Sequence, residues 1–226
     1  MRRDIVICIG TIGSPTFERC RRTVDAVAVS SRRVDRVVVI RDKRPQSAWL
    51  NQMRLESRGT KWCMQVDEDM YLHKNALLRL LEFAEKKEAS GARILNASSL
   101  LYDLFLEREV GSLKLWSSKA LAELEFRDIL GGDRDIAKRA KSLGYKNYSI
   151  NDVLGSHDSA PTAAIAFSKY YEYTQKIRKF RTESSARKFC ESLRLKWEKN
   201  PTYINKKAYD GSKHGLADSL KDKSKR

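Results

Sequence analysis

Residues 62–72 read WCMQVDEDMYL, an apolar run that passes directly into three acidic residues. The first five residues have the length and composition of a buried strand. The acids Asp67, Glu68 and Asp69 therefore follow the carboxyl end of a predicted strand, where open α/β sheets bind their ligands. A solvated turn or a helix cap has the same composition, so the surrounding sequence has to distinguish these alternatives.

The acidic cluster lies within an alternation of strand-like and helix-like patterns. The predicted elements are strands at 5–9, 37–40, 62–66 and 94–97 and helices at 17–29, 47–56 and 75–85. Such alternation is typical of βαβ units, in which helices cover both faces of a sheet. We therefore predict an α/β fold with a mostly parallel, Rossmann-like central sheet and flanking helices.

The pattern becomes less regular after Gly111. It predicts a strand at 113–116, a helix beginning at Ser117 or Ser118 and a helix at 133–143. Beyond residue 158 we predict helices at 163–180 and 184–199, followed by a polar, basic end whose composition is compatible with disorder. The expected organisation is one catalytic domain over residues 1–158 and a basic helical extension over residues 159–226.

The net charge of +16 is concentrated near the carboxyl end of the chain. Residues 159–226 contain 17 Lys and Arg against 7 Asp and Glu, whereas residues 1–158 contain 28 against 22. A positive surface attracts polyanions such as nucleic acid, an anionic membrane surface or an acidic polymer. A solvated, lysine-rich surface without a partner is the alternative.

Apolar runs and cysteines indicate the class of protein. No run approaches the ~20 apolar residues of a membrane helix, and the first residues are charged too early for a signal peptide. The four cysteines form no CxxC pair, so they resemble reduced packing residues more than zinc ligands or a disulfide framework. We expect a soluble, cytoplasmic protein.

Crowded carboxylates also predict a cation. Three adjacent acids repel one another unless a positive charge neutralises them, and hard oxygen ligands suit Mg²⁺ or Mn²⁺. Because alternate strand residues face the same way, Asp67 and Asp69 are expected to point together while Glu68 points elsewhere. Such an ion would stabilise the charge that develops on a departing diphosphate.

Taken in order, four segments resemble GT-A glycosyltransferases, especially the inverting enzymes of family two. Residues 67–69 resemble the DxD segment, and residues 111–116 resemble the segment in which a small residue lets donor and acceptor approach the backbone. Residues 133–145 are similar to the acceptor-side motif, and residues 151–157 match the stretch with a late, metal-binding histidine. The resemblance covers residues 4 to about 158.

The resemblance implies roles for individual residues. Asp133 falls at the position of the catalytic base; the family usually has a Glu just before it, and because Gly132 stands there we keep Asp135 as the substitute. The implied metal ligands, Mn²⁺ or Mg²⁺ being the ion, are Asp67, Asp69 and His157. The implied nucleotide-sugar-binding residues are Thr11, Asp42, Asp67 and Gly111, and the predicted acceptor-binding residues are Trp116, Lys176 and Arg178.

The implied reaction moves a sugar from a nucleotide diphosphate donor, a UDP-sugar being favoured, to an acceptor hydroxyl with inversion. The loop at 10–15 has neither the P-loop nor the dinucleotide fingerprint, which argues against kinases and dehydrogenases. A polyanionic acceptor would explain the basic extension, and a hydroxymethylated pyrimidine in phage-type DNA is one such acceptor. The alternatives are a cell-surface polysaccharide or lipid-linked acceptor, a nucleotidyltransferase, and a non-catalytic nucleic-acid-binding protein.

Overall fold

The structure is a computed structural model that describes residues 3–218. The chain divides into two compact units. The first unit contains the chain up to Asp128 together with Gly132–Asp158. The second, which we call the C-terminal unit, contains Ile129–Gly131 and the chain from Ser159 onward.

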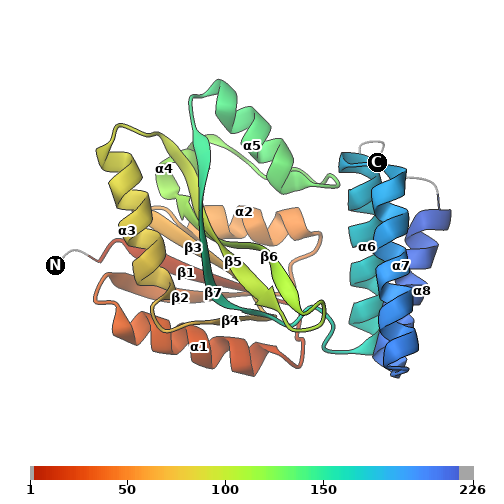
Figure 1. Cartoon of the computed structure of the whole chain (residues 1–226). Helices are drawn as coiled ribbons and strands as arrows, with labels where there is room; N and C mark the ends of the chain where they lie inside the picture. Colours follow the sequence, from red (N-terminus) through yellow and green to blue (C-terminus); the bar gives the residue numbers. More distant parts are fainter. Residues whose placement is uncertain (1–2, 219–226) are drawn as a thin grey trace. The chain divides into compact units, whose positions relative to one another are not determined.

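One curled, seven-stranded sheet organises the first unit (Figure 1). Its strands are β1 (Ile5–Thr11), β2 (Val34–Arg41), β3 (Trp62–Asp67), β4 (Met70–Leu72), β5 (Ile94–Asp103), β6 (Arg108–Ser117) and β7 (Lys146–His157), in the order β2-β1-β3-β6-β5-β7-β4. Three neighbouring pairs are parallel and three are antiparallel. The α/β class is confirmed, but the sheet is mixed and not mostly parallel. The short turn after β5 makes β6 run back along it, which accounts for the two antiparallel pairs of β6, and β4 adds the third by pairing with β7.

Helices cover both faces of the sheet. They are α1 (Phe17–Ser30), α2 (Gln46–Glu56), α3 (Ala76–Ala89), α4 (Ser118–Glu123) and α5 (Gly132–Ser142). One core lies between the sheet and α1 and α3, and the other lies against α2, α4 and α5. Successive residues of β1 alternate between the two cores, because strand side chains point to opposite faces.

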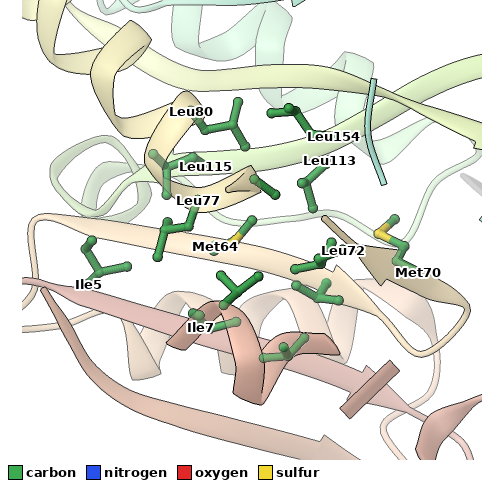
Figure 2. Close-up of a cluster of buried hydrophobic side chains, with 14 of the residues drawn as sticks. Ile5, Ile7, Met64, Met70, Leu72, Leu77, Leu80, Leu113, Leu115 and Leu154 are labelled. Carbon is green, nitrogen blue, oxygen red and sulfur yellow. The ribbon is translucent and has the colours of Figure 1, made fainter. Parts of the chain in front are cut away.

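Figure 2 shows the first of these cores, where side chains from β1 and β3 meet leucines of α3. Ile5, Ile7 and Met64 are fully buried there, and Leu77 and Leu80 are at most 1% exposed. Burial of one such side chain contributes roughly 1.5–3 kcal/mol. This core fixes β3, and with it the position of the acids that follow.

The helices predicted at 17–29, 47–56 and 75–85 are confirmed with small shifts of their ends. The strand predicted at 94–97 continues to Asp103, and β4 and β7 have no predicted counterpart. β7 escapes prediction because its first half is polar and mostly exposed, so pairing with β5 and β4 defines it instead of a local apolar pattern.

The C-terminal unit consists of α6 (Ala163–Phe180), α7 (Glu183–Lys199) and α8 (Tyr203–Ala217) (Figure 1). Each helix begins after a threonine whose hydroxyl accepts a backbone N–H; these caps are Thr162, Thr182 and Thr202. The predictions for the first two helices are confirmed within one residue. The prediction of disorder beyond residue 199 is wrong for α8; residues 219–226 lie outside the described part.

Small residues hold α8 against α6. A Cβ atom at Gly211 would lie 2.2 Å from the Phe167 carbonyl oxygen, and one at Gly215 would lie 2.7 Å from the Tyr171 carbonyl oxygen. The buried face of α8 therefore shows no apolar periodicity that a sequence pattern could reveal. Within residues 3–218, no helix is long and apolar enough to cross a membrane, and all four cysteines are buried and free, as predicted.

Candidate active site

The acids lie at the carboxyl ends of the parallel strands. Asp67 ends β3 opposite Gly10 of β1, and the backbone N–H of Glu68 donates to the Gly10 carbonyl (3.1 Å). The next strand along contributes Asp42, whose backbone N–H donates to the Thr11 carbonyl (2.9 Å). Three chain segments far apart in sequence thus meet at one edge, as the α/β pattern predicts.

Glu68, the middle acid, holds the loop after β1. Its carboxylate accepts hydrogen bonds from the Thr11 hydroxyl and from the backbone N–H groups of Ile12 (3.3 Å) and Ser14 (2.9 Å). Glu68 therefore shapes this loop. The hydroxyl of Thr11, a predicted nucleotide-binding group, is engaged in this contact.

Asp69, His157 and Asp103 form a short chain of polar contacts. β7 pairs with β4 so that His157 lies opposite Met70, and it pairs with β5 so that His157 lies beside Asp103. The His157 Nε2 atom is 3.2 Å from Asp69 Oδ2, and its Nδ1 atom is 2.8 Å from Asp103 Oδ2. The sheet thus joins the predicted metal ligands Asp69 and His157, although they are far apart in sequence.

The donor set fits a divalent cation that is shared with a ligand. No group of three or more His, Cys, Asp or Glu within residues 3–218 is arranged to hold a metal ion by itself. However, Mg²⁺ is often bound by only one or two carboxylates together with substrate phosphates. A metal-binding histidine also characteristically has a carboxylate on its other ring nitrogen, and His157 has Asp103 there.

The pKa values of two neighbouring side chains are raised by burial and by nearby acids. Burial raises the pKa of the Cys20 thiol to about 12, and the charges of Asp69 and Asp67 add to this effect. Burial, followed by the charge of Asp158, likewise raises the pKa of Tyr71 to about 12. The Arg19 guanidinium lies 4.1 Å from the centre of the Tyr71 ring. A bound cation would relieve this negative potential.

A small cavity lies directly beside the acids. It has a volume of about 170 Å³ and is lined by Gly10, Thr11, Ile12, Lys43, Gln46, Trp49 and residues 67–69. Complete small-molecule pockets usually measure about 300–1,000 Å³, so this cavity has room for only part of a nucleotide sugar. A Cβ atom at Gly10 would lie 2.8 Å from the Trp49 ring, so only glycine leaves that ring in place.

Lys43, Gln46 and Trp49 were not predicted as site residues. The basic run RDKR at residues 41–44, directly after β2, was the available signal for Lys43. Trp49 and Gln46 reach the cavity from the first turn of α2, and this depends on how α2 returns to the sheet. Asp103 was also missed, although an acid at the end of an apolar strand is the same signal that revealed Asp67.

No protein-family model matches the chain, and no curated protein is significantly similar to it. Among solved structures, the mannosyltransferase PcManGT from Pyrobaculum calidifontis, in complex with GDP-Man and Mn²⁺, matches with a TM-score of 0.60 at 11% identity, over 96% of this chain and 70% of that one. S. aureus TarS 1-349 matches with a TM-score of 0.52 at 9% identity, over 95% and 90%. Glucosyl-3-phosphoglycerate synthase from Mycobacterium tuberculosis, in complex with Mn²⁺, UDP-glucose and phosphoglyceric acid, matches with a TM-score of 0.50 at 10% identity, over 77% and 79%.

The chain has the GT-A fold. At this level of identity the likeness concerns the fold alone. It confirms the fold that the order of sequence motifs predicted, and the similarity to PcManGT extends over nearly the whole chain.

Within this GT-A fold, Asp133 and Asp135 have different surroundings. Asp133, in the first turn of α5, is 58% exposed, and its carboxylate is 3.4 Å from the Lys114 ammonium group. Lys114, on β6, lies opposite Gln65 of β3, two residues before Asp67. Asp135 is 17% exposed and forms an ion pair with Arg139 (2.8 Å). Of the two candidates, Asp133 is the one accessible to an acceptor.

The structure contradicts the prediction that Trp116 binds the acceptor. It is 1% exposed, and its indole N–H donates to the Gln65 side-chain oxygen (3.0 Å), so it is a core residue. Gly111, on β6, has open space where a Cβ atom would lie. This space leaves room for a ligand. The role of Gly111 in binding the nucleotide sugar stays a prediction.

The two acceptor-binding predictions in the C-terminal unit have different outcomes. The structure contradicts the prediction for Arg178. Its guanidinium donates to the carbonyls of Gly215 (3.0 Å) and Asp218 (2.6 Å) at the carboxyl end of α8, and it also pairs with Glu183. Lys176 has no ion-pair partner among the described residues and stays a candidate.

Proposed function

We propose that this chain is a metal-dependent, inverting glycosyltransferase that uses a nucleotide diphosphate sugar, with a UDP-sugar as the favoured donor. The observation that carries the proposal is the series of polar contacts that joins Asp69 to His157 and His157 to Asp103. The cavity beside it supports the same conclusion, because it joins the acids to a lysine and a tryptophan.

In this proposal Asp67, Asp69 and His157 hold a Mn²⁺ or Mg²⁺ ion, which when bound neutralises charge on the leaving diphosphate. Lys43 adds a second positive charge to the phosphate side of the cavity. Asp133 accepts the proton of the acceptor hydroxyl, whose oxygen forms a bond to the anomeric carbon as the bond to the diphosphate oxygen breaks. Attack from the opposite side inverts the sugar configuration.

The first experiment measures release of nucleoside diphosphate from a panel of UDP- and GDP-sugars with Mn²⁺, with EDTA, and with the Asp69→Ala and Asp133→Asn variants. Asp152→Asn is the matched control, because Asp152 is a partly exposed acid paired with Arg79. We expect release that requires metal, falls at least 100-fold in Asp69→Ala and Asp133→Asn, and is unchanged in the control. Absence of release with every donor would refute an active transferase and favour a binding protein.

We further propose that the acceptor is a hydroxymethylated pyrimidine in DNA. Support comes from the basic C-terminal unit, in which Lys188 and Lys199 are exposed and make no ion pair with any residue in the described range 3–218. They are eleven residues apart on α7, which is close to three full turns, so they share one side of the helix. Lysines spaced along one side suit a phosphate backbone.

Aromatic side chains accompany these charges. Trp197 stacks on Tyr209 with ring centres 5.9 Å apart, and Lys206 lies over the Trp197 ring. Tyr203 is 65% exposed with Lys207 beside its ring. Interleaved lysines and aromatic rings are typical of surfaces that bind single-stranded or unstacked bases. A base inside duplex DNA would have to be flipped out to reach an active site.

Fluorescence anisotropy with duplex DNA, with and without hydroxymethylated cytosine, tests this acceptor. We expect affinity that falls steeply with salt and a decrease in affinity in the double variant Lys188→Glu and Lys199→Glu, with donor turnover stimulated by the modified duplex. Binding that is absent or insensitive to salt would refute the DNA proposal. Donor turnover unaffected by DNA, together with binding to anionic vesicles, would favour the polysaccharide or lipid-linked acceptor.

A further inference from the structure

Asp103 occupies an unusual position for a carboxylate. It is the last residue of β5, and its side chain is only 2% exposed. One oxygen, Oδ1, accepts the backbone N–H groups of Phe105 (3.0 Å) and Leu106 (2.7 Å), which form the turn into β6. The other oxygen, Oδ2, faces His157 Nδ1 at 2.8 Å. One carboxylate oxygen of Asp103 therefore holds the turn, and the other contacts the imidazole ring.

The contacts of Asp103 determine which ring nitrogen of His157 carries a proton. Both ring nitrogens face carboxylate oxygens, which accept hydrogen bonds and donate none. The Asp103 oxygen is closer to Nδ1 (2.8 Å) than the Asp69 oxygen is to Nε2 (3.2 Å), so the neutral ring keeps its single proton on Nδ1. In the neutral ring the lone pair is then on Nε2, which points toward Asp69. This is the arrangement that a histidine needs in order to bind a metal ion next to a carboxylate.

We propose that Asp103 is a positioning residue that selects the Nδ1–H tautomer of His157 and thereby makes Nε2 available to the metal ion. This inference rests on the metal site of the proposed function. Asp103 would not touch the donor or the ion. It would act only through the imidazole ring, and the same side chain would tie that ring to the turn between β5 and β6.

Asp103→Asn separates this role from a general packing role. The asparagine has the same shape, and its single oxygen can still accept the Phe105 and Leu106 N–H groups. Its amide nitrogen would then face His157 Nδ1 and donate to it. The ring would have to accept at Nδ1 and carry its proton on Nε2, so the lone pair that the ion needs would be lost although the shape of the site is kept.

Two measurements test the proposal on the purified full-length protein with and without UDP, whose diphosphate supplies the further oxygens of a shared ion. Mn²⁺ affinity is obtained from the electron paramagnetic resonance signal of the free ion, and the protonated nitrogen of the neutral ring is identified by long-range ¹H–¹⁵N correlation at alkaline pH. We expect Asp103→Asn to bind Mn²⁺ about 10- to 100-fold more weakly and to shift the ring proton from Nδ1 to Nε2. The matched Asp152→Asn variant should show neither change.

A His157→Ala background distinguishes positioning from loss of a nearby negative charge. If Asp103 acts through the ring, Asp103→Asn should have little further effect on Mn²⁺ affinity once His157 is absent. An equal loss in both backgrounds, or an unchanged tautomer in a variant that melts like the wild type, would overturn the inference. Absence of Mn²⁺ binding to the wild-type protein both with and without UDP would instead refute the metal site of the proposed function.

Discussion

Replacement of Glu68 by alanine should release the loop that follows β1. The carboxylate of Glu68 accepts three hydrogen bonds from this loop, and two of them come from the backbone of Ile12 and Ser14. Hydrogen bonds to a charged acceptor contribute ~1.5–3 kcal/mol when buried, and we take ~1 kcal/mol or slightly less for each because this carboxylate is partly exposed. Their loss should therefore favour opening of the loop by about 2–3 kcal/mol, or roughly 30- to 150-fold.

Amide hydrogen exchange followed by NMR measures this opening directly. In Glu68→Ala, the exchange of the Ile12 and Ser14 amides should accelerate by that factor, while amides in the middle of β3 should remain protected. Glu18→Ala is the matched control, because Glu18 is exposed, acidic and close in sequence, but makes no contact of this kind with a described residue. Unchanged exchange at Ile12 and Ser14 would refute the role of Glu68 as the anchor of the loop.

The loop also borders the cavity, so the same variant has a functional consequence. Thr11 and Ile12 line the cavity beside the acids, and a mobile loop would have to be ordered again when a donor binds. Donor affinity should therefore fall, whereas Mn²⁺ affinity should fall less than in Asp69→Ala. A variant that loses metal before it loses donor affinity would show that Glu68 is itself a ligand.

Three further predictions concern close packing and burial. Gly211→Ala should lower the free energy of unfolding of the C-terminal unit by about 1–3 kcal/mol, because its Cβ atom would overlap the Phe167 carbonyl; thermal unfolding compared with the exposed Lys213→Ala measures this. Gly10→Ala should push the Trp49 ring out of place, which a change in tryptophan fluorescence and weaker donor binding would reveal. The pKa of Tyr71 is about 12 in the folded protein, against an ordinary value of 10. This difference contributes up to about 2–3 kcal/mol to the free energy of unfolding; the contribution is complete below pH 10 and is lost as the pH rises from 10 to 12. Tyr71→Phe should remove that part of the alkaline destabilisation in denaturant titrations, and identical pH profiles would contradict the assignment.

The sequence by itself determined the elements whose buried face has a strong local period. The apolar runs of β1 and β3 and the leucine stripe of α3 are visible in the sequence because each element buries a regular set of side chains. The same local reasoning placed the three acids at the end of β3. It also identified His157, through its place in the order of motifs and not through any contact.

Only the tertiary structure determined which distant residues meet. Asp103 and His157 are 54 residues apart, and they touch because β5 and β7 pair in a particular register. Trp116 was predicted to bind the acceptor, but the antiparallel pairing of β6 with β3 and β5 places it in the core. The helix α8 was not predicted because small and polar residues, namely glycine, alanine, serine and asparagine, form its buried face. Strand register and close helix packing depend on partners far away along the chain, so local periodicity contains no information about them.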